Sequence, residues 1–396
     1  MNHSILNIVF NKTIIVCFIL LLLVSNIYGR PIWVSLFNSQ QVRSVVISAY
    51  NGQLTVSSDD GTQFVITAGQ AVYASLTDGK IRISGVNGHV GSFESVIVQG
   101  ADSSAIIRLR PVSPQIGARN YEGMVSLSAD VDRIQLINRI DEEHYIAGVI
   151  EAEVGQGQAS EFYKAKSVIC RTYLYGNIDR HENEGFHLCD EVHCQAFKGQ
   201  CRNHNILTAV TAAKGVILTD REDSKPILAA YHANCGGETE SAHNAWQNDL
   251  PFLIPVTDPH CAHTNNANWQ KSISLDDWIS YLMKNGLKLD PALVTDFSFQ
   301  QVHRVPDYTV NDFTIPVRKI RNDWQLRSSF FSIVVEDENV VLQGRGYGHG
   351  VGLCQEGAME MGRQGFKYDD MISFYYKYVN LVAVSELQIR IPEFDQ

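Results

Sequence analysis

The alternation of apolar and polar residues in the first third of the chain predicts β-hairpins. Between Pro31 and about Ile140, short runs with a period of two residues are separated by Asn-Gly and Asp-Gly pairs, which favour tight turns. This region contains no cluster of acids, histidines or cysteines, so we expect a scaffold or an accessory binding domain. The apolar positions are Val45, Ile47, Ala49, Leu54, Val56, Ile81 and Ile83, and the turn pairs are Asn51-Gly52, Asp60-Gly61, Asp78-Gly79 and Asn87-Gly88.

Beyond residue 140 the apolar residues also follow helical spacing. Phe162, Ala165, Ile169, Tyr173 and Leu174 fall on one stripe, which predicts a helix over 161–177. We expect further helices over 206–214, near 275–284 and after Gln355, strands over 216–219 and 226–233, and a strand or hairpin over 330–341. The predicted fold class is α+β, with an N-terminal all-β region over 30–140 and a mixed α/β domain over 141–385.

Residues 1–29 have the pattern of a secretory signal peptide. Lys12 precedes an unbroken apolar run from Ile14 to Val24, and small or polar residues follow up to Gly29. The run is too short to span a bilayer, and no later stretch reaches the roughly 18 apolar residues that a span needs. We therefore expect an exported chain that begins near Arg30 and has no membrane span. A membrane anchor and a buried strand are the alternative interpretations of this segment.

The net charge and the cysteines limit the possible partners. A formal net charge of −11 argues against non-specific nucleic-acid binding and against a polyanionic wall polymer as the chief partner. Cys17 lies in the predicted signal peptide, and the odd number of cysteines that remain cannot all pair within one chain. Some are therefore expected to bind metal or to stay reduced. They are Cys170, Cys189, Cys194, Cys201, Cys235, Cys261 and Cys354.

The segment Tyr145–Val154 places Glu151 and Glu153 among apolar residues. Burial of a carboxylate costs several kcal/mol unless it is protonated or paired, so apolar surroundings raise the pKa of a carboxyl group. A general acid near neutral pH needs such a raised pKa, and cleavage of a glycosidic bond needs one such acid. Many buried acids only cap or pair, so this pattern alone does not identify a catalytic site.

Histidines and cysteines are crowded between residues 181 and 201. Imidazole and thiolate ligands at this density suit tetrahedral Zn²⁺. The adjacent pair His193-Cys194 does not match the usual zinc-finger spacing, so disulfides and free core thiols remain alternatives. Our preferred ligands are His181, Cys189, His193 and Cys194, with His187 as the alternative to His181 and Cys201 as the remaining cysteine of the group.

Two later segments also carry polar side chains beside glycines. Tyr231–Thr239 ends in a Gly-Gly pair and Glu238, and Gly344–Ala358 contains alternating glycines. If the second segment is extended, Arg345, Tyr347 and His349 share one side; a tight turn is the alternative. The chain lacks the H-E-x-x-H, G-x-S-x-G, P-loop and G-x-G-x-x-G patterns, so metalloprotease, α/β-hydrolase and nucleotide-binding functions lack their usual support.

Taken in order, these segments resemble the SpoIID/LytB family over roughly residues 141–380. The resemblance is carried by Tyr145–Glu153, Tyr163–Tyr173, His193-Cys194-Gln195, Tyr231 with Gly236–Thr239, and Gly346–Ala358. Sporulation members are lytic transglycosylases that act on peptidoglycan glycan strands without stem peptides, and some carry zinc. The resemblance implies Glu153 as the catalytic acid/base, a structural zinc, and substrate contacts from Lys164, Arg171, Tyr231, His349 and Gln355.

The implied reaction uses one carboxyl group. Glu153 would protonate the glycosidic oxygen between N-acetylmuramic acid and N-acetylglucosamine, and would then accept the proton of the C6 hydroxyl as a 1,6-anhydro ring closes. Lys164 and Arg171, seven residues apart on the predicted helix, would bind the lactyl carboxylate. The family also implies an alternative, a non-catalytic wall-binding module that stimulates a cell-wall amidase. Zinc-dependent hydrolysis is a third hypothesis.

Two departures from the family pattern affect the predicted site. Gly155–Ala159 replaces a stretch that is usually rich in proline or contains tryptophan, and Cys354 stands where a small residue such as serine is usual. The resemblance also implies a location at the cell wall, periplasmic or extracellular.

Overall fold

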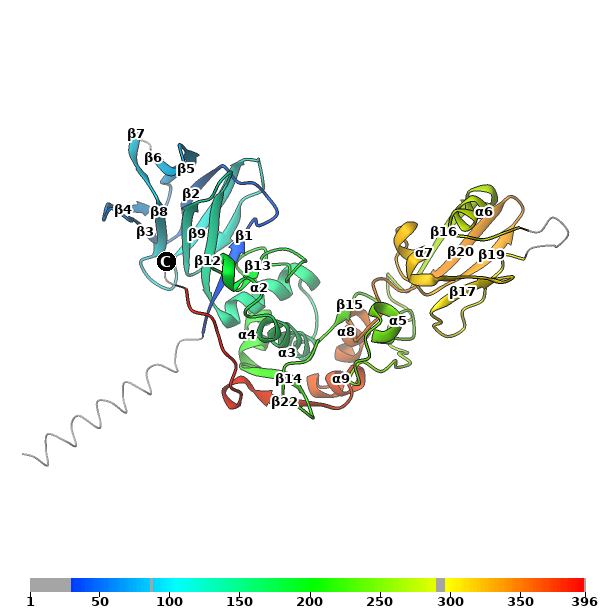
Figure 1. Cartoon of the computed structure of the whole chain (residues 1–396). Coiled ribbons are helices and arrows are strands. Elements are labelled where there is room, and N and C mark those ends of the chain that lie inside the picture. Colours follow the sequence, from blue (N-terminus) through cyan, green and yellow to red (C-terminus); the bar gives the residue numbers. More distant parts are fainter. Residues whose placement is uncertain (1–29, 86–87, 290–295, 395–396) are drawn as a thin grey trace, which may run out of the picture. The chain divides into compact units, whose positions relative to one another are not determined.

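The computed structural model describes residues 30–85, 88–289 and 296–394, so the predicted signal peptide lies outside the described residues. The chain forms two compact units (Figure 1). The first consists of the described residues within 30–154, 177–211 and 390–394, and the second of those within 155–176 and 212–389. This division differs from the predicted boundary at residue 140, because the segment with Glu153 and the histidine- and cysteine-rich segment belong to the β-rich unit.

The first unit is built on two β-sheets that pack against each other, with contacts of β6 to β8 and β11 and of β8 to β9. A seven-stranded sheet has the order β13-β1-β12-β11-β8-β3-β4, and a six-stranded sheet has the order β10-β9-β2-β5-β6-β7. The strands are β1 (Pro31–Leu36), β2 (Ser44–Asn51), β3 (Gln53–Ser58), β4 (Gln63–Thr67), β5 (Ala71–Thr77), β6 (Lys80–Gly85), β7 (Gly88–Phe93), β8 (Ser95–Gly100), β9 (Ile106–Ser113), β10 (Arg119–Tyr121), β11 (Met124–Ala129), β12 (Ile134–Asp141) and β13 (Leu188–Cys189).

The predicted alternation in this region is confirmed. All seven apolar positions named from the sequence are buried, because every second side chain of a strand points into the core between the sheets. Asp60-Gly61 and Asp78-Gly79 join paired strands, as expected. The hairpin predicted at Asn51-Gly52 is wrong: β2 and β3 lie in different sheets, so the chain crosses between them. The turn residues favour a local reversal but do not decide which strands pair.

Two α-helices lie among the described residues of the first unit. Helix α2 (Glu142–Val154) begins where the Asp141 carboxylate accepts the Glu143 amide over 2.9 Å, and its residues Tyr145–Ile150 are buried. The short η1 (Glu182–Glu184) and β13 follow in the histidine- and cysteine-rich segment, and α4 (His204–Ala212) matches the helix predicted over 206–214. The first unit therefore holds both the acid segment and the predicted metal ligands.

Helix α3 (Ser160–Gly176) confirms the helix predicted over 161–177 and packs against β14, α8 and α9 of the second unit. The other elements here are β14 (Val216–Asp220), β15 (Tyr231–His232), α5 (Ala242–Trp246), β21 (Leu353–Cys354), α8 (Gln355–Arg363), α9 (Tyr368–Tyr375), β22 (Val379–Ala383) and η2 (Val384–Glu386). The strand predicted over 226–233 is wrong except for Tyr231 and His232. The confirmed fold class is α+β.

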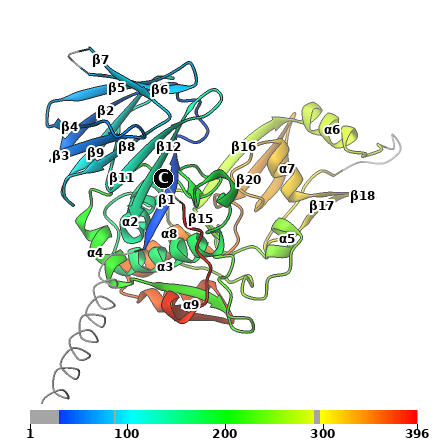
Figure 2. The ribbon, with the colours of Figure 1, turned by 60° about the vertical axis from the view of Figure 1, so that its left-hand side comes forward.

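The chain between β16 and β20 forms a lobe of the second unit with its own core. It contains β16 (Asn268–Ser274), α6 (Leu275–Lys284), β17 (Asp307–Val310), β18 (Phe313–Pro316), α7 (Val317–Asp323), β19 (Phe331–Glu336) and β20 (Asn339–Arg345), drawn in yellow-green to orange in Figure 2. Trp278, Tyr308, Ile320 and Ile333 are among the fully buried residues that join these elements. The predicted amphipathic helix near 275–284 and the hairpin within 330–341 are confirmed.

The glycine-rich segment after β20 is irregular up to Gly352. Gly346, Gly348, Gly350 and Gly352 all have positive φ angles, between 72° and 113°, so the extended arrangement with three side chains on one side is wrong. At Gly352 a Cβ atom would lie 2.1 Å from the Ala230 carbonyl oxygen, so glycine is required there on steric grounds as well. No helix in the described part of the chain is both long and apolar enough to cross a membrane.

Candidate functional site

Glu151 and Glu153 lie in the last turn and a half of α2, on different sides of the helix. The Glu151 carboxylate accepts the backbone amide of Arg202 over 2.8 Å, which ties α2 to the segment that leads into α4. Glu153 is half-buried, and its Oε2 atom is shielded from solvent. Glu151 thus has a structural contact, and Glu153 is the acid at the very end of the helix.

Lys164 and Arg171 both lie on α3 in the second unit, but their surroundings differ. Lys164 is partly exposed, and its Nζ donates to Glu161 Oε1 over 2.7 Å. Arg171 is fully buried, and its Nη1 donates to the carbonyl oxygens of Ala213 (2.9 Å) and Val216 (3.2 Å). Arg171 therefore fixes α3 to the segment before β14, while Lys164 is the more accessible cation of the two.

Tyr231 lies against a lysine that no local sequence pattern marks. Lys166 is fully buried, and its Nζ lies 3.0 Å from the centroid of the Tyr231 ring. A cation at this position is attracted by the negative face of the ring. Tyr231 also pairs in parallel with Leu353 of β21, which brings the glycine-rich segment beside it.

His349 contacts the same region from the glycine-rich segment. Its Nε2 donates to the Tyr231 carbonyl oxygen over 3.0 Å, and its Nδ1 accepts the Val351 amide over 3.1 Å. Burial lowers the pKa of His349 to about 4, so the ring is neutral at pH 7. The Trp246 ring lies 5.1 Å from the His349 ring and is 39% exposed, so a broad aromatic surface remains available.

A cavity of about 440 Å³ lies beside His349 and Trp246. Asn244, Glu240 and Ser329 contribute polar side chains to its wall, and α7 contributes two arginines, Arg318 and Arg321. Within the described residues, the Arg321 Nε is buried without a hydrogen-bond partner. The cavity thus combines an aromatic ring with guanidinium groups, a combination that suits a sugar bearing a carboxylate.

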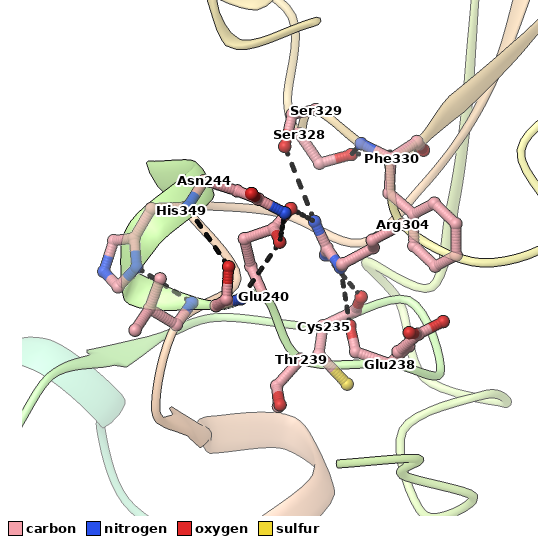
Figure 3. Close-up of polar contacts among 12 residues, drawn as sticks. Cys235, Glu238, Thr239, Glu240, Asn244, Arg304, Ser328, Ser329, Phe330 and His349 are labelled. Atoms are coloured by element: carbon pink, nitrogen blue, oxygen red, sulfur yellow. Dashed lines mark hydrogen bonds and ion pairs between the residues drawn. The ribbon is translucent and has the colours of Figure 1, made fainter. Parts of the chain in front are cut away.

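Arg304 anchors the wall of this cavity (Figure 3). Its side chain is 3% exposed, and its Nη1 lies 3.4 Å from Glu240 Oε2. Its Nε donates to the Glu238 carbonyl oxygen and its Nη2 to the Cys235 carbonyl oxygen, both over 2.7 Å. The guanidinium therefore joins the lobe between β16 and β20 to the Gly-Gly loop after β15.

Glu356 is a second anchor, next to the predicted site residue Gln355. Its carboxylate accepts from Asn234 Nδ2 over 2.7 Å and also from the side chains of Thr264 and Asn266. In the described chain, the Gln355 Oε1 is buried and has no hydrogen-bond partner. No local pattern indicated the role of Glu356, because its partners lie about 90 residues or more away in the chain.

The predicted metal ligands of the first unit come together. One ligand atom from each of His181, Cys189, His193 and Cys194 lies within 4.8 Å of the other three. Cys194 Sγ is 3.4 Å from His181 Nε2 and 3.6 Å from His193 Nδ1. A hydrogen bond from Cys189 lowers the pKa of Cys194 to about 6, which favours its metal-binding thiolate form.

The surroundings distinguish His181 from the alternative ligand His187. His181 Nδ1 lies 2.6 Å from Glu184 Oε1, so a carboxylate orients the ring whose other nitrogen faces the cluster. Both ring nitrogens of His187 are engaged elsewhere, with the Trp33 amide (3.1 Å) and the Pro392 carbonyl oxygen (2.9 Å). His187 therefore cannot serve as a ligand of this cluster while these hydrogen bonds persist.

Comparisons with known proteins agree with the observed segments. Residues 130–219 match the family described as SpoIID, stage II sporulation protein. Stage II sporulation protein D of Bacillus subtilis is 26% identical over 261 residues, which cover 61% of this chain and 75% of that protein. An uncharacterized protein of Brachyspira hyodysenteriae is 27% identical over 271 residues, 66% of this chain and 72% of its own length. The amidase enhancer of Bacillus subtilis is 25% identical over 293 residues, 60% of this chain and 40% of its own length.

Proposed function

We propose that this chain, which belongs to the SpoIID family, is an exported lytic transglycosylase that cleaves the glycan strands of peptidoglycan. Two relatives are named stage II sporulation protein D and amidase enhancer, and these names fit a function at the cell wall. The expected substrate is a strand of alternating N-acetylglucosamine and N-acetylmuramic acid from which the stem peptides have been removed.

The placement of Glu153 carries this proposal. Both acids of the α2 segment are half-buried; Glu151 accepts the Arg202 amide, and Glu153 lies one residue before the helix ends with its Oε2 atom shielded from solvent. The C-terminal turn of a helix has partial negative charge, and α2 has no basic residue in its last turn to offset it. We therefore assign the role of proton donor to Glu153 rather than to Glu151.

In the proposed reaction Glu153 acts first as an acid and then as a base. Its proton passes to the glycosidic oxygen, and the bond from that oxygen to C1 of N-acetylmuramic acid breaks. The Glu153 carboxylate then accepts the proton of the C6 hydroxyl, whose oxygen bonds to C1 and closes the 1,6-anhydro ring. No water is consumed, so the second carboxylate of an ordinary glycosidase is not needed.

We assign glycan binding to the cavity beside Trp246 and His349. Trp246 and His349 beside the cavity offer ring surfaces on which a sugar can stack, and Arg321 and Arg318 offer donors for the lactyl carboxylate. That carboxylate is free only after the stem peptide has been removed, which supports a denuded strand as substrate. Lys164, Tyr231 and Gln355 are further candidates for contact with the strand, whereas Arg171 acts by positioning α3.

The cluster of His181, Cys189, His193 and Cys194 fits Zn²⁺ by its donor set of two nitrogens and two sulfurs. Tetrahedral zinc with bonds of about 2.0–2.3 Å separates its ligands by roughly 3.3–3.8 Å, and the contacts of Cys194 fall in this range. Four protein ligands leave no position for water, so the proposed ion is structural. It would hold η1 and the loop after β13 together.

The decisive experiment is mass spectrometry of products from intact and from amidase-treated peptidoglycan. The wild-type chain should release fragments with 1,6-anhydro ends from the amidase-treated strands, and Glu153→Gln should reduce this release at least about 100-fold. Glu151→Gln is the matched control, because it removes the same charge two residues away and should keep most of the activity. Unchanged activity of Glu153→Gln would overturn the assignment.

The name of one relative, amidase enhancer, supports a second candidate function. In that case the chain would bind glycan strands and stimulate a cell-wall amidase without cleaving them. The wild-type chain would then yield no anhydro product from either substrate, while adding it to an amidase would raise the release of stem peptides. The Glu153→Gln variant would stimulate as well as the wild type.

A further inference from the structure

Three cysteines and an aspartate of the second unit meet in a buried cluster apart from the predicted metal ligands. Cys235, Asp258, Cys261 and Cys354 are each fully buried, and one ligand atom from each lies within 4.8 Å of the others. Cys235 Sγ is 3.3 Å from Cys261 Sγ and 3.3 Å from Asp258 Oδ2. We propose that this cluster is a second metal site, which binds Zn²⁺ through three sulfurs and one carboxylate oxygen.

The dimensions and the ligand types fit zinc. Tetrahedral zinc with Zn–S bonds of about 2.3 Å separates its sulfur ligands by roughly 3.8 Å. In this cluster the Cys235 and Cys261 sulfurs are 3.3 Å apart, and the four ligand atoms all lie within 4.8 Å of one another. Sulfur ligands favour Zn²⁺ over the hard cations Mg²⁺ and Ca²⁺, which prefer oxygen. Four acidic groups packed in a core without solvent repel one another once ionised, and a dication compensates that charge.

Backbone amides are already directed at two of the sulfurs. The amides of Cys235 and Gly357 both donate to Cys354 Sγ over 3.3 Å, and the Gly237 amide donates to Cys261 Sγ over 3.3 Å. Cys354 is the N-cap of α8, where the partial positive charge of the helix favours a thiolate. These donors stabilise the deprotonated sulfurs that a metal requires.

The carboxylate of Asp258 is held in place by its own partners. The Tyr375 hydroxyl donates to Asp258 Oδ2 over 2.8 Å, and the His260 amide donates to Oδ1 over 2.9 Å. A Cβ atom at Gly357 would lie 2.3 Å from Asp258 Oδ2, so the absence of a side chain there leaves room for this carboxylate. Such outer contacts orient the ligands of metal sites.

The proposed ion would join three segments that are distant in sequence. Cys235 follows β15, Cys261 lies in the loop before β16, and Cys354 ends β21. Tyr231 and His349 lie on the first and third of these segments, so the ion would stabilise the wall that carries them. Figure 3 also shows Cys235 beside Arg304, whose guanidinium places a positive charge near this sulfur-rich cluster.

A disulfide between Cys235 and Cys261 is the competing chemistry, because their sulfurs are close. It would not use Cys354 or Asp258, although both are buried in the same cluster and have donors directed at them. Cys235, Cys261 and Cys354 are not joined by a disulfide in this structure.

The test is the zinc content of the full-length chain, measured by mass spectrometry of the purified protein. We expect two zinc ions per chain. His193→Ala combined with Cys194→Ser disables the first cluster and should leave one ion, and X-ray absorption of that variant should show three sulfurs and one oxygen. Cys261→Ser combined with Cys354→Ser should also leave one ion, whereas Cys201→Ser, the matched control outside both clusters, should keep two.

Two results would overturn the proposal. One is a His193→Ala, Cys194→Ser variant that folds without zinc. The other is alkylation showing that Cys235 and Cys261 react only after reduction. If the cysteine variants do not fold, Asp258→Asn keeps all three sulfurs and should lose zinc to a chelator about 10-fold faster than the wild type; an unchanged rate would also count against the site. These results do not depend on whether Glu153 is catalytic.

Discussion

The ammonium of Lys166 lies 3.0 Å from the centroid of the Tyr231 ring, with Lys166 fully buried. A buried lysine needs a compensating interaction, and a cation over an aromatic ring in a desolvated place contributes about 2 kcal/mol. The pair joins α3 to β15, two elements that both carry candidate site residues. It therefore holds the Tyr231 side chain in one orientation.

Replacement of Tyr231 should separate the role of the ring from that of the hydroxyl. We expect Tyr231→Leu, which keeps apolar volume but removes the ring face, to be less stable than Tyr231→Phe by roughly 2 kcal/mol. Urea denaturation followed by circular dichroism measures this difference. Equal stability of the two variants would show that the ring face contributes nothing.

Replacement of Arg304 should lower the free energy of unfolding by more than replacement of Tyr231 does. Arg304→Met leaves Glu240 buried without its cation and leaves the carbonyl oxygens of Glu238 and Cys235 without a donor. Loss of one partner of a buried pair costs about 3–5 kcal/mol. Lys319→Met is the control, because Lys319 and Asp323 form an exposed pair, 48% and 36% accessible, that contributes about 0.5 kcal/mol. Similar unfolding midpoints for both variants would contradict the anchoring role of Arg304.

Much of the fold follows from local patterns, and the exceptions are long-range contacts. The period of two residues in β2, β3 and β6 reports which face is buried, and the structure confirms it. The helical period predicts α3 itself but not its burial, because α3 is buried on nearly all sides, Lys166 and Arg171 included. The turn at Asn51-Gly52 carries the same signal as the real hairpins, yet β2 and β3 pair with other strands, because pairing depends on the whole sandwich.

The same distinction applies to the candidate site. The first metal cluster is visible in the sequence because its ligands lie within 14 positions, from His181 to Cys194. The second spans Cys235 to Cys354, so neither its members nor the partners of Arg304 and Glu356 can be grouped before the chain is folded. The extended arrangement of Arg345, Tyr347 and His349 failed because alternating glycines permit left-handed backbone at every second position.

If the first cluster binds zinc, replacement of His181 and replacement of His187 should affect the zinc content of the chain differently. His181→Ala should remove one zinc ion and lower the free energy of unfolding by several kcal/mol, since metal binding is coupled to folding. His187→Ala should keep the zinc, because its ring binds the Trp33 amide and the Pro392 carbonyl oxygen instead. Metal analysis and thermal unfolding of both variants check this. Zinc loss in His187→Ala with full occupancy in His181→Ala would reverse the ligand assignment.

The lowered pKa of His349 predicts a pH dependence of stability. Its pKa is about 4 in the folded chain, below the ordinary value of 6.5, so the unfolded chain binds a proton first as the pH falls. The stabilisation is present above pH 6.5 and is lost between pH 6.5 and about 4, at about 1.4 kcal/mol per unit of pKa shift. Buried His232, whose pKa is also lowered, contributes in the same direction.

Substitution isolates the contribution of His349. Unfolding free energies measured from pH 7.5 to 4 should fall less steeply for His349→Gln than for the wild type. His243→Gln, which changes a histidine whose side chain is 64% exposed, should follow the wild-type curve. Parallel curves for the wild type and His349→Gln would show that this histidine does not titrate differently in the two states.

The cavity beside Trp246 predicts how the chain distinguishes its ligands. Arg321 lines the cavity, and a carboxylate on the ligand would accept from its guanidinium group. Arg321→Ala should therefore weaken binding of denuded strands by about 10- to 100-fold, the range for a hydrogen bond to a charged group. Oligomers of N-acetylglucosamine alone lack the lactyl carboxylate, so their binding should change little.

Trp246→Ala should weaken the binding of both ligands, because ring stacking does not depend on the carboxylate. Calorimetric titration of the two variants with the two ligands tests this pattern, and an equal loss for both ligands in Arg321→Ala would exclude recognition of the carboxylate by this arginine.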